Sequence, residues 1–477
     1  MVKPGPPSLL SVVHMISRTD ATALDEIRSR LPGAVHEPGD PEYAEACTLF
    51  NSMIERRPAL VARCETPDDV IAALALARER DLDIAVRAGG HSVAGLSLVD
   101  DGLVIDVRGM SGIEVDAERR IARVGAGVTW AQLDRATQPY GLATTGGRVS
   151  TTGVAGLTLG GGSGWLERKH GLACDNLLAV ELVTADGELV RASEDEHPEL
   201  FWAHRGGGGN FGVVTSFEFR LHPLESEVLA GLALYPAERG RELLALYRDV
   251  MRDAPEELSL ACGYLTAPAE PDIPEHLHGR LVVAILGMHA GPVEAGEEAL
   301  GELRAFGPPE VDFFGPMPYP DFQCMIDDPP GYRNYWTDEH LTDLPDAAIE
   351  AIASRSEELP PGPAQLFIVA WGGAVARASE EASPLGGRDA RFVVHPFALW
   401  EDPADDERMI SWARAFREDL REFATGAVYL NFIGDEGEAR VRAGYGPRSY
   451  DRLARIKAEW DPENVFRASG NVAPSTG

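Results

Sequence analysis

The chain has 477 residues, and its 43 Lys and Arg against 76 Asp and Glu give a formal net charge of −33. This excess of acid argues against nucleic acid as a partner, and against an anionic membrane surface, because the negative charges would repel each other. Hydrophobic residues make up 44% and charged residues 25%, values ordinary for globular proteins, so global disorder is excluded. No apolar run approaches the ~18 residues that cross a bilayer.

The N-terminus carries no recognisable export signal. Residues 1–20 lack the basic start, the long apolar core and the small-residue cleavage site of a signal peptide. We expect the residues before Met15 to form an unstructured leader, with Met15 as an alternative start. The odd number of cysteines, five, argues against a disulfide scaffold. These features predict a cytoplasmic protein.

The first elements of the chain predict a βαβ unit. Thr66 precedes a proline and two aspartates, which is typical of a helix start, and apolar residues at helical spacing extend the helix to residue 80. Apolar runs at 83–87 and 103–107 indicate buried strands. A strand-rich stretch over 113–128 and a helix over 130–137 follow.

Residues 141–164 hold an unusual concentration of glycine in a mostly uncharged segment. Such a stretch is not expected to form a strong helix or a regular strand, but it lets the backbone lie against a ligand. Strands are expected again at 177–184, 188–191 and 211–219.

The region 226–425 has a different composition, with proline-rich loops between its elements, and we expect a second α+β domain there. Its expected strands are 280–287, 365–371 and 393–400, and its expected helices are 239–251, 294–305 and 407–423. A strand over 428–432 and a helix over 448–459 are expected to close the chain.

The first candidate motif, Arg87-Ala88-Gly89-Gly90-His91-Ser92, directly follows an expected strand. Paired glycines at such a point form a turn whose N–H groups can face an anion, with His91 at its tip. A simple turn with a solvated histidine is equally compatible with the local sequence.

Two further motifs follow the glycine-rich segment. Gly207 to Gly212, with Asn210 inside, matches G-x-G-x-x-G, but the β-branched run that includes Val214 follows instead of a helix. The dinucleotide-helix interpretation therefore fails, and a glycine-lined loop against a cofactor remains. Gly171-Leu172-Ala173-Cys174-Asp175-Asn176 places a lone cysteine nearby; lone cysteines are most often small buried residues.

The last motif is Val428-Tyr429-Leu430-Asn431-Phe432. On a strand, Tyr429 and Asn431 point to the same face, which fits either a site lining or a solvent-facing strand. His276 and His278 form an H-x-H pair in a proline-rich loop without further ligands at suitable spacing, so no metal site is expected.

Together these motifs, in this order, resemble those of the berberine-bridge-enzyme-like FAD-linked oxidases, whose FAD domain is shared with vanillyl-alcohol oxidase and p-cresol methylhydroxylase. Residues 87–92 resemble the family's histidyl-flavin motif, and 171–176 resemble its cysteinyl-flavin motif. Residues 152–162 resemble the cofactor cradle, and 450–467, with Asp461-Pro462-Glu463-Asn464-Val465-Phe466-Arg467, resemble the C-terminal signature. The tail that contains Asn471 is looser than the usual ending of the family.

The resemblance implies an α+β, two-domain flavoprotein. Its FAD-binding domain would span 45–225, its substrate domain, an antiparallel sheet covered by helices, 226–425, and a segment 426–474 would return to the FAD domain. FAD would be attached twice, through His91 to the flavin 8α position and through Cys174 to C6. The implied cofactor-binding residues are Arg87, Gly89, Gly90, His91, Ser92, Gly147, Thr152, Gly153, Gly156, Gly160, Gly161, Gly162, Cys174, Asp175, Asn176, Asn210, Gly212, Val214 and Asn471.

The resemblance also implies an oxidoreductase that removes hydride from a hydroxyl-bearing carbon of a small molecule such as a sugar, a secondary alcohol or a natural product. Tyr429 would act as the base, helped by Asn431, and O₂ or another acceptor would reoxidise the flavin. Two alternatives stay open. One is an amine oxidase of the 6-hydroxy-D-nicotine oxidase kind, a branch that uses the histidyl link alone, and the other is a flavin-binding protein without turnover. The oligomeric state also stays open.

Overall fold

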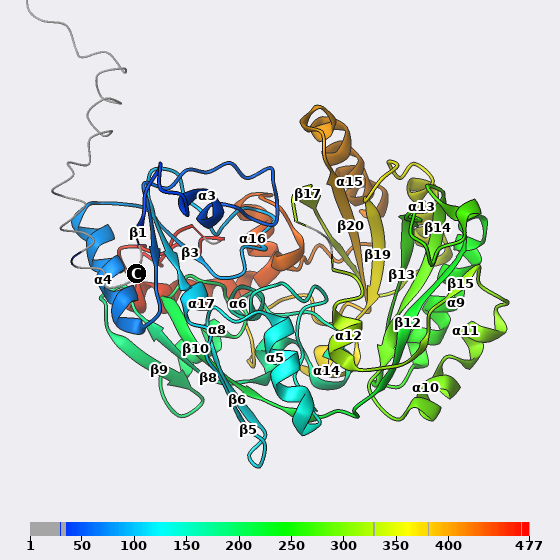
Figure 1. Ribbon diagram of the computed structural model, residues 1–477, viewed down its shortest axis with the longest axis horizontal. Helices are drawn as coiled ribbons and strands as arrows, with labels where there is room; N and C mark the ends of the chain where they lie inside the picture. Colours follow the sequence, from blue (N-terminus) through cyan, green and yellow to red (C-terminus); the bar gives the residue numbers. More distant parts are fainter. Residues whose placement is uncertain (1–28, 30–34, 328–329, 380, 469, 477) are drawn as a thin grey trace, which may run out of the picture.

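The computed structural model describes residue 29 and residues 35–327, 330–379, 381–468 and 470–476. The expected leader and Met15 therefore lie outside the described residues. Within those residues the strands form sheets of four, five and nine strands and one two-stranded pair. The two smaller sheets occupy one half of the molecule and the nine-stranded sheet the other (Figure 1). No helix in the described part of the chain is long and apolar enough to cross a membrane.

The four-stranded sheet confirms the expected βαβ unit. Helix α4 (Pro67–Glu79) begins with a capping box, in which Thr66 Oγ1 accepts from the Asp69 N–H and the Asp69 carboxylate accepts from the Thr66 N–H. Strands β2, β4 and β3 run parallel, and β1 pairs antiparallel with β2. The strands are β1 (Val35–His36), β2 (Leu60–Arg63), β3 (Ile84–Arg87) and β4 (Leu103–Asp106), with α3 (Tyr43–Ala46) between β1 and β2.

The five-stranded sheet is antiparallel and lies beside the first one (Figure 1). Its order is β5 (Ile113–Asp116), β6 (Ile121–Gly125), β10 (Val213–Arg220), β8 (Leu177–Val183) and β9 (Leu189–Ser193). Its connections carry the helices α5 (Trp130–Thr137), α6 (Val154–Leu159), α7 (Glu167–His170) and α8 (Pro198–His204) and the short strand β7 (Leu142–Ala143). Strand β7 pairs with β11 (His222–Pro223), which directly follows β10. The expected strands and the helix over 130–137 are confirmed here.

The glycine-rich segment forms no long helix or strand, but the six-residue helix α6 lies inside it. Val154, Ala155 and Thr158 of α6 are buried. Packing therefore stabilises a helix of six residues that intrinsic propensity would not support.

Glycine also permits unusually close backbone contacts in this segment. A Cβ atom added to Gly153 would lie 2.5 Å from the backbone nitrogen of Gly89, and one added to Gly89 would lie 2.3 Å from that of Gly153. The loop after β3 and the start of α6 thus touch backbone to backbone.

The nine-stranded sheet is antiparallel, and helices α9 (Gly240–Asp253), α13 (Asp346–Ser356) and α15 (Asp406–Leu420) pack on it through one apolar cluster (Figure 1). Its main strands in order are β15 (Val311–Asp312), β12 (Val228–Pro236), β14 (Leu281–His289), β13 (Leu258–Thr266), β19 (Gln365–Ala370), β20 (Phe392–Trp400) and β17 (Arg333–Trp336). Strand β16 (Gly315–Met317) pairs with β12, and β18 (Glu339–Leu341) pairs with β20.

Four shorter helices complete this half: α10 (Val293–Ala299), α11 (Gly301–Ala305), α12 (Tyr319–Gln323) and α14 (Gly373–Arg377). The single helix expected over 294–305 is therefore two helices. The break falls at Leu300, directly before Gly301. Glycine destabilises the interior of a helix, so a continuous helix through this point is disfavoured.

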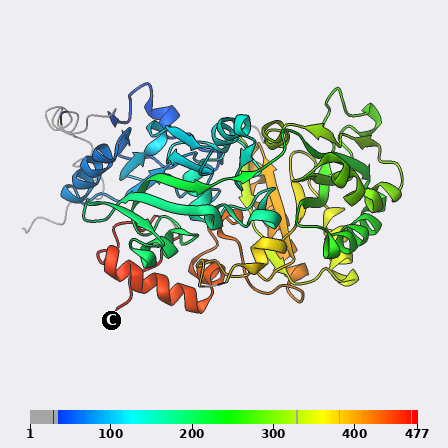
Figure 2. The same cartoon turned by 90° about the horizontal axis from the view of Figure 1, so that it is seen from below.

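The end of the chain returns to the first half of the molecule, where α17 (Pro447–Trp460), after α16 (Glu438–Tyr445), packs against α8 (Figure 2). The buried Lys457 ammonium donates to the Asp461 carboxylate (2.6 Å) and to the carbonyls of Asn210 (2.6 Å) and Phe466 (2.8 Å). The ion pair lies within the C-terminal signature, and the bond to the Asn210 carbonyl ties that signature to the segment just before β10 of the five-stranded sheet.

The strand expected over 428–432 is wrong. Residues Leu430–Phe432 form a 3₁₀ turn, and no strand ladder includes this segment among the described residues. Its backbone is held by side chains instead, since the Tyr429 N–H donates to the Asp338 carboxylate (3.0 Å).

The contact between Gly89 and Gly153 generates the first prediction. Gly153→Ala should lower the free energy of unfolding by about 1–3 kcal/mol, because backbone atoms cannot move aside for the new methyl group. The matched control is Gly301→Ala, whose added methyl group meets no atom of the described residues within 4 Å. Urea denaturation of both variants measures the difference. Equal stability of the two variants would contradict the assigned contact.

A stacked histidine pair generates the second prediction. The rings of His170 and His222 lie 3.8 Å apart. Burial and the neighbouring His222 lower the pKa of His170 to about 3, and burial and the neighbouring Arg220 lower that of His222 to about 4. An unfolded histidine titrates near pH ~6.5, so between about pH 6.5 and 4 the unfolded chain binds more protons. Stability should therefore fall as the pH decreases through that window, by on the order of 1 kcal/mol per histidine at about pH 5.5. His222→Gln should make the dependence shallower in urea titrations at several pH values; an unchanged slope would exclude this pair as a cause.

Candidate active site and cofactor cavity

A cavity of 1230 Å³ lies where the two halves of the molecule meet. One wall consists of loops and helix ends from the two smaller sheets, and a second wall consists of strands β12, β13, β14, β19 and β20 of the nine-stranded sheet. The C-terminal segment supplies a third wall, from Leu430 to Val441 and from Phe466 to Ala473. Because ligand pockets usually measure ~300–1,000 Å³, this cavity has room for a large ligand and a small one together.

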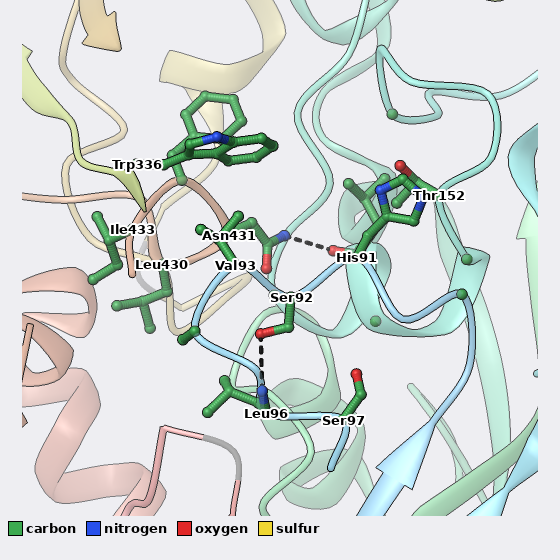
Figure 3. A pocket seen from close by; sticks show the side chains of 18 of the residues that line it. His91, Ser92, Val93, Leu96, Ser97, Thr152, Trp336, Leu430, Asn431 and Ile433 are labelled. Atoms are coloured by element: carbon green, nitrogen blue, oxygen red, sulfur yellow. Dashed lines mark hydrogen bonds between the residues drawn. The ribbon is translucent and has the colours of Figure 1, made fainter. Parts of the chain in front are cut away.

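His91 lies on the wall nearest to β3, and Figure 3 shows it beside Thr152. Its ring stacks on Phe50 at 4.5 Å, and its Nε2 lies 3.0 Å from the Thr151 hydroxyl. Burial lowers the pKa of His91 to about 4. The imidazole is therefore neutral at neutral pH, the state in which a ring nitrogen can form a covalent bond.

The glycine-rich segment forms a cradle at the same wall. The predicted residues that line the cavity are Gly89, Gly90, His91, Ser92, Gly147, Thr152, Gly153, Gly156, Gly160, Gly212, Val214, Asn431 and Asn471. Gly156 is exposed there, and a Cβ atom added to it would meet no described atom within 4 Å. Ser92 folds the loop back, since its Oγ accepts from the Leu96 N–H (Figure 3). The cradle therefore leaves open space for a flat ligand against its backbone.

The C-terminal tail closes this end of the cavity. The Asn210 side-chain oxygen accepts from the Val472 N–H (3.0 Å), so Asn210 anchors the tail and does not itself line the cavity. Asn471 lines it, and its buried side-chain oxygen has no partner in the described part of the chain. This orphaned oxygen fits a donor on a bound cofactor. The sequence analysis did not predict that Lys457 holds the C-terminal segment in place. A lysine four residues before Asp461, in a chain with three lysines, is nevertheless a sequence signal for an ion pair within one helix end.

Several predicted cofactor residues instead hold the framework together. Arg87 donates to the backbone carbonyls of residues 45, 46 and 48. Asp175 forms an ion pair with Arg388 (2.8 Å), and Asn176 lies 2.6 Å from His222 Nε2. Gly161 and Gly162 make room for other parts of the protein, the Tyr429 ring and the Ala173 methyl group. These five residues lie outside the set of described residues that line the cavity.

Cys174 also lies outside that set. Its side chain is fully buried, with Sγ 3.7 Å from Arg388 Nη2 and 3.8 Å from the Asp175 carboxylate. Burial and the neighbouring carboxylate raise the pKa of the thiol to about 12. A neutral thiol in this position is poorly placed to bond a cofactor in the cavity.

The structure brings Tyr429 and Asn431 together, as expected, but gives them different surroundings. The Tyr429 hydroxyl oxygen accepts from the Gly162 N–H (2.6 Å), the Ser163 N–H (2.9 Å) and Asn431 Nδ2 (2.9 Å). Tyr429 is buried outside the cavity lining, and burial raises its pKa further above the usual value near 10. Asn431 itself reaches the cavity and also donates to the Leu157 carbonyl (Figure 3).

The wall formed by the nine-stranded sheet is mostly apolar and aromatic. Phe367 and Val369 of β19, Phe397 of β20 and Trp336 of β17 line it. The neighbouring Tyr335 lies outside the lining, where its hydroxyl donates to the Glu436 carboxylate (3.2 Å) and accepts from Arg414 Nε (3.0 Å). Within the described residues, no group of three or more His, Cys, Asp or Glu could hold a metal ion.

The lining also includes residues that were not predicted, among them Arg148, Trp165 and His395. Arg148 directly follows Gly147 in the glycine-rich segment, and Trp165 directly follows Gly164 at its end. His395 belongs to β20, and its place at the cavity follows from the packing of distant segments, which the sequence pattern does not reveal.

Comparison with known proteins finds family matches in the N-terminal half of the chain and in its C-terminal segment. Residues 58–193 match the model of an FAD-binding domain family, and residues 428–473 match the berberine and berberine-like family. The chain is 32% identical to the (R)-6-hydroxynicotine oxidase of Paenarthrobacter nicotinovorans over 93% of this chain and 97% of that protein. It is 30% identical to the uncharacterized FAD-linked oxidoreductase YgaK of Bacillus subtilis over 94% and 98%.

Solved structures agree in fold. The crystal structure of 6-hydroxy-D-nicotine oxidase from Arthrobacter nicotinovorans matches with a TM-score of 0.85 at 30% identity, over 93% of this chain and 98% of that chain. Xylooligosaccharide oxidase from Myceliophthora thermophila shares the fold with a TM-score of 0.83 at 23% identity, over 95% and 100%. The expected α+β, two-domain flavoprotein fold is confirmed. The chain belongs to the berberine-bridge-enzyme-like family of FAD-linked oxidoreductases, and it is an FAD-dependent oxidoreductase.

Proposed function

We propose that the protein oxidises a hydroxyl-bearing carbon of a small molecule, by hydride transfer, in the cavity between the glycine cradle and the nine-stranded sheet. The observation that carries this proposal is the continuity of the cavity, which joins His91 and Gly156 to the apolar wall of β19 and β20. FAD bound against the cradle would supply the hydride acceptor. The protein would hold the substrate against that acceptor and exclude water.

We propose further that the FAD is attached covalently through His91. The neutral imidazole, its position on the cavity wall and the open space at Gly156 support this attachment. The sequence also predicted a bond between Cys174 and the flavin. The buried position of Cys174 supports a single link instead, so the proposed cofactor is monocovalent FAD.

The proposed role of Tyr429 changes with its surroundings. As a base it would have to reach the substrate, whereas its oxygen is already occupied by three N–H donors outside the cavity lining. We propose that Tyr429 fixes Asn431 and the backbone at Gly162, and that Asn431 contacts the cofactor or the substrate. The proposed FAD domain comprises residues 45–225 and 426–474, and the proposed substrate domain comprises 226–425.

A second candidate is the oxidation of a carbon–nitrogen bond in an amine. Two observations favour it: His91 lines the cavity whereas Cys174 does not, and the chain is 32% identical to a protein named (R)-6-hydroxynicotine oxidase. Hydride transfer from a neutral amine needs no base to remove a hydroxyl proton. This chemistry suits a site in which Tyr429 lies outside the cavity lining.

Anaerobic mixing of the purified flavoprotein with three substrate sets tests the function. The sets are aryl and secondary alcohols, oligosaccharides, and cyclic or aryl amines, and the measurement is loss of the oxidised flavin absorbance. Alcohols should reduce the flavin if the leading proposal holds, and amines alone should do so if the second holds. Subsequent admission of O₂ shows whether oxygen is the acceptor. A flavin that no set reduces would contradict both proposals and favour a binding protein without turnover.

Single substitutions test the attachment. His91→Ala should leave all flavin in the supernatant after acid denaturation, whereas Cys174→Ser should retain the colour of the wild-type pellet, because only His91 lines the cavity. Cys174→Ser is the matched control, since both residues lie in predicted flavin-linkage motifs. Peptide mass measurements on the wild type should find FAD on the His91 peptide. A second adduct on the Cys174 peptide would overturn the monocovalent proposal.

A further inference from the structure

Arg148 places a cation on the cavity wall, close to the boundary between the two halves. Its Nη1 donates to Ser163 Oγ (2.8 Å), its Nη2 donates to the Glu167 carboxylate (2.5 Å), and its guanidinium lies 4.9 Å from the centre of the Trp165 ring. Glu167 is fully buried and also accepts from Ser163 Oγ and the Gly164 N–H. The Glu167 carboxylate therefore accepts from several donors, and it binds only the Nη2 group of the Arg148 guanidinium.

Two N–H donors remain unused at this point of the cavity. In the described part of the chain, Arg148 Nε and Trp165 Nε1 are both buried without a hydrogen-bond partner, and both residues line the cavity. Buried donors are nearly always paired in proteins, so an unpaired set beside a cavity indicates an acceptor on the ligand. Because one donor belongs to a cation, the matching group is an oxygen that is anionic or accepts strongly.

The loop that carries Arg148 is fixed from both sides. Gln323 of α12 donates to the Gly147 carbonyl (2.9 Å), and the Ser150 N–H and hydroxyl both donate to the Asp327 carboxylate (2.6 Å each). These contacts join the loop to the segment around α12 on the other half of the molecule. The guanidinium is thus held in place before a ligand arrives, as a recognition residue requires.

The apolar wall opposite the cradle indicates what the rest of the ligand is like. Ala261, Leu286 and Val369 from three neighbouring strands line the sheet side of the cavity, with Phe367 and Phe397 beside them. His395 is also in the lining, buried, with neither ring nitrogen partnered among the described residues. Such a wall offers few donors for a sugar with many hydroxyl groups and a good surface for an aromatic ring.

We propose that Arg148 is a specificity-determining residue that binds a carboxylate, or another oxygen of high negative charge, on an otherwise apolar aromatic substrate. This inference rests on the proposed function, because it assumes that the substrate is bound and oxidised in this cavity. An oxygen of the cofactor ring offers the same acceptor chemistry, so the experiment must separate the two sources.

Binding of benzoate and benzamide to the purified flavoprotein tests the proposal without turnover. The two probes have the same shape and differ in charge, and flavin absorbance or tryptophan fluorescence reports binding. The wild type should bind benzoate about ten-fold or more tightly than benzamide. Arg148→Met combined with Glu167→Gln should abolish that preference and change benzamide affinity by no more than about two-fold. The second substitution avoids a buried, unpaired carboxylate, which could unfold the single variant.

Arg148→Lys and Arg239→Met serve as comparisons. Lys keeps the charge but loses Nε and the planar fork, so part of the preference should remain. Arg239 also lies over an aromatic ring, Phe306 at 3.6 Å, away from the cavity, so its loss should leave the preference intact.

A wild type without preference for benzoate would overturn the proposal, and so would a double variant that keeps the preference. A double variant that keeps the preference and also has a shifted flavin spectrum or lowered flavin content would assign Arg148 to the cofactor. Flavin reduction by the substrate sets described above is measured separately, so failure of the proposed oxidation and failure of this inference give different results.

Discussion

The site depends on a backbone contact that only glycine permits. Gly89 and Gly153 touch with no room for a Cβ atom on either, and this contact joins the loop after β3 to the start of α6. Through it, His91 comes within 3.0 Å of Thr151, and the glycine cradle comes to lie beside the histidine. One apolar cluster packs the two smaller sheets together, and the glycine contact adds the close approach of the histidine loop to the cradle.

The same principle extends to the C-terminal segment. A Cβ atom on Gly160 would lie 2.1 Å from the Asn431 side-chain oxygen, and one on Gly161 would lie 2.9 Å from the Tyr429 ring. Since Tyr429 is also bound to Asp338 at the end of the nine-stranded sheet, one short segment connects the cradle to the other half of the molecule. The glycine cradle and the wall of the nine-stranded sheet are therefore positioned by the same few residues.

Much of the fold could be predicted because its signals are local. The capping residues at Thr66 and the apolar runs around it define a βαβ unit without reference to the rest of the chain. The motifs at 87–92 and 152–162 were likewise readable, and the structure brings both to one cavity. The segment at 428–432 shows the limit: its alternating pattern suits a strand, but side-chain contacts with distant residues give it a 3₁₀ turn. Cys174 and Arg148 show the same limit for the site, because burial and cavity access arise from packing between segments far apart in sequence.

In the proposed arrangement FAD lies in this cavity, bonded to His91, with its ring between the glycine cradle and the sheet wall. A crystal structure of the protein purified with its flavin tests this arrangement directly. We expect electron density joining the His91 ring to the flavin, an isoalloxazine ring in contact with Gly156 and Asn431, and Cys174 buried behind the cradle. A flavin outside this cavity, or one bonded to a Cys174 side chain that has turned into it, would contradict the proposed arrangement.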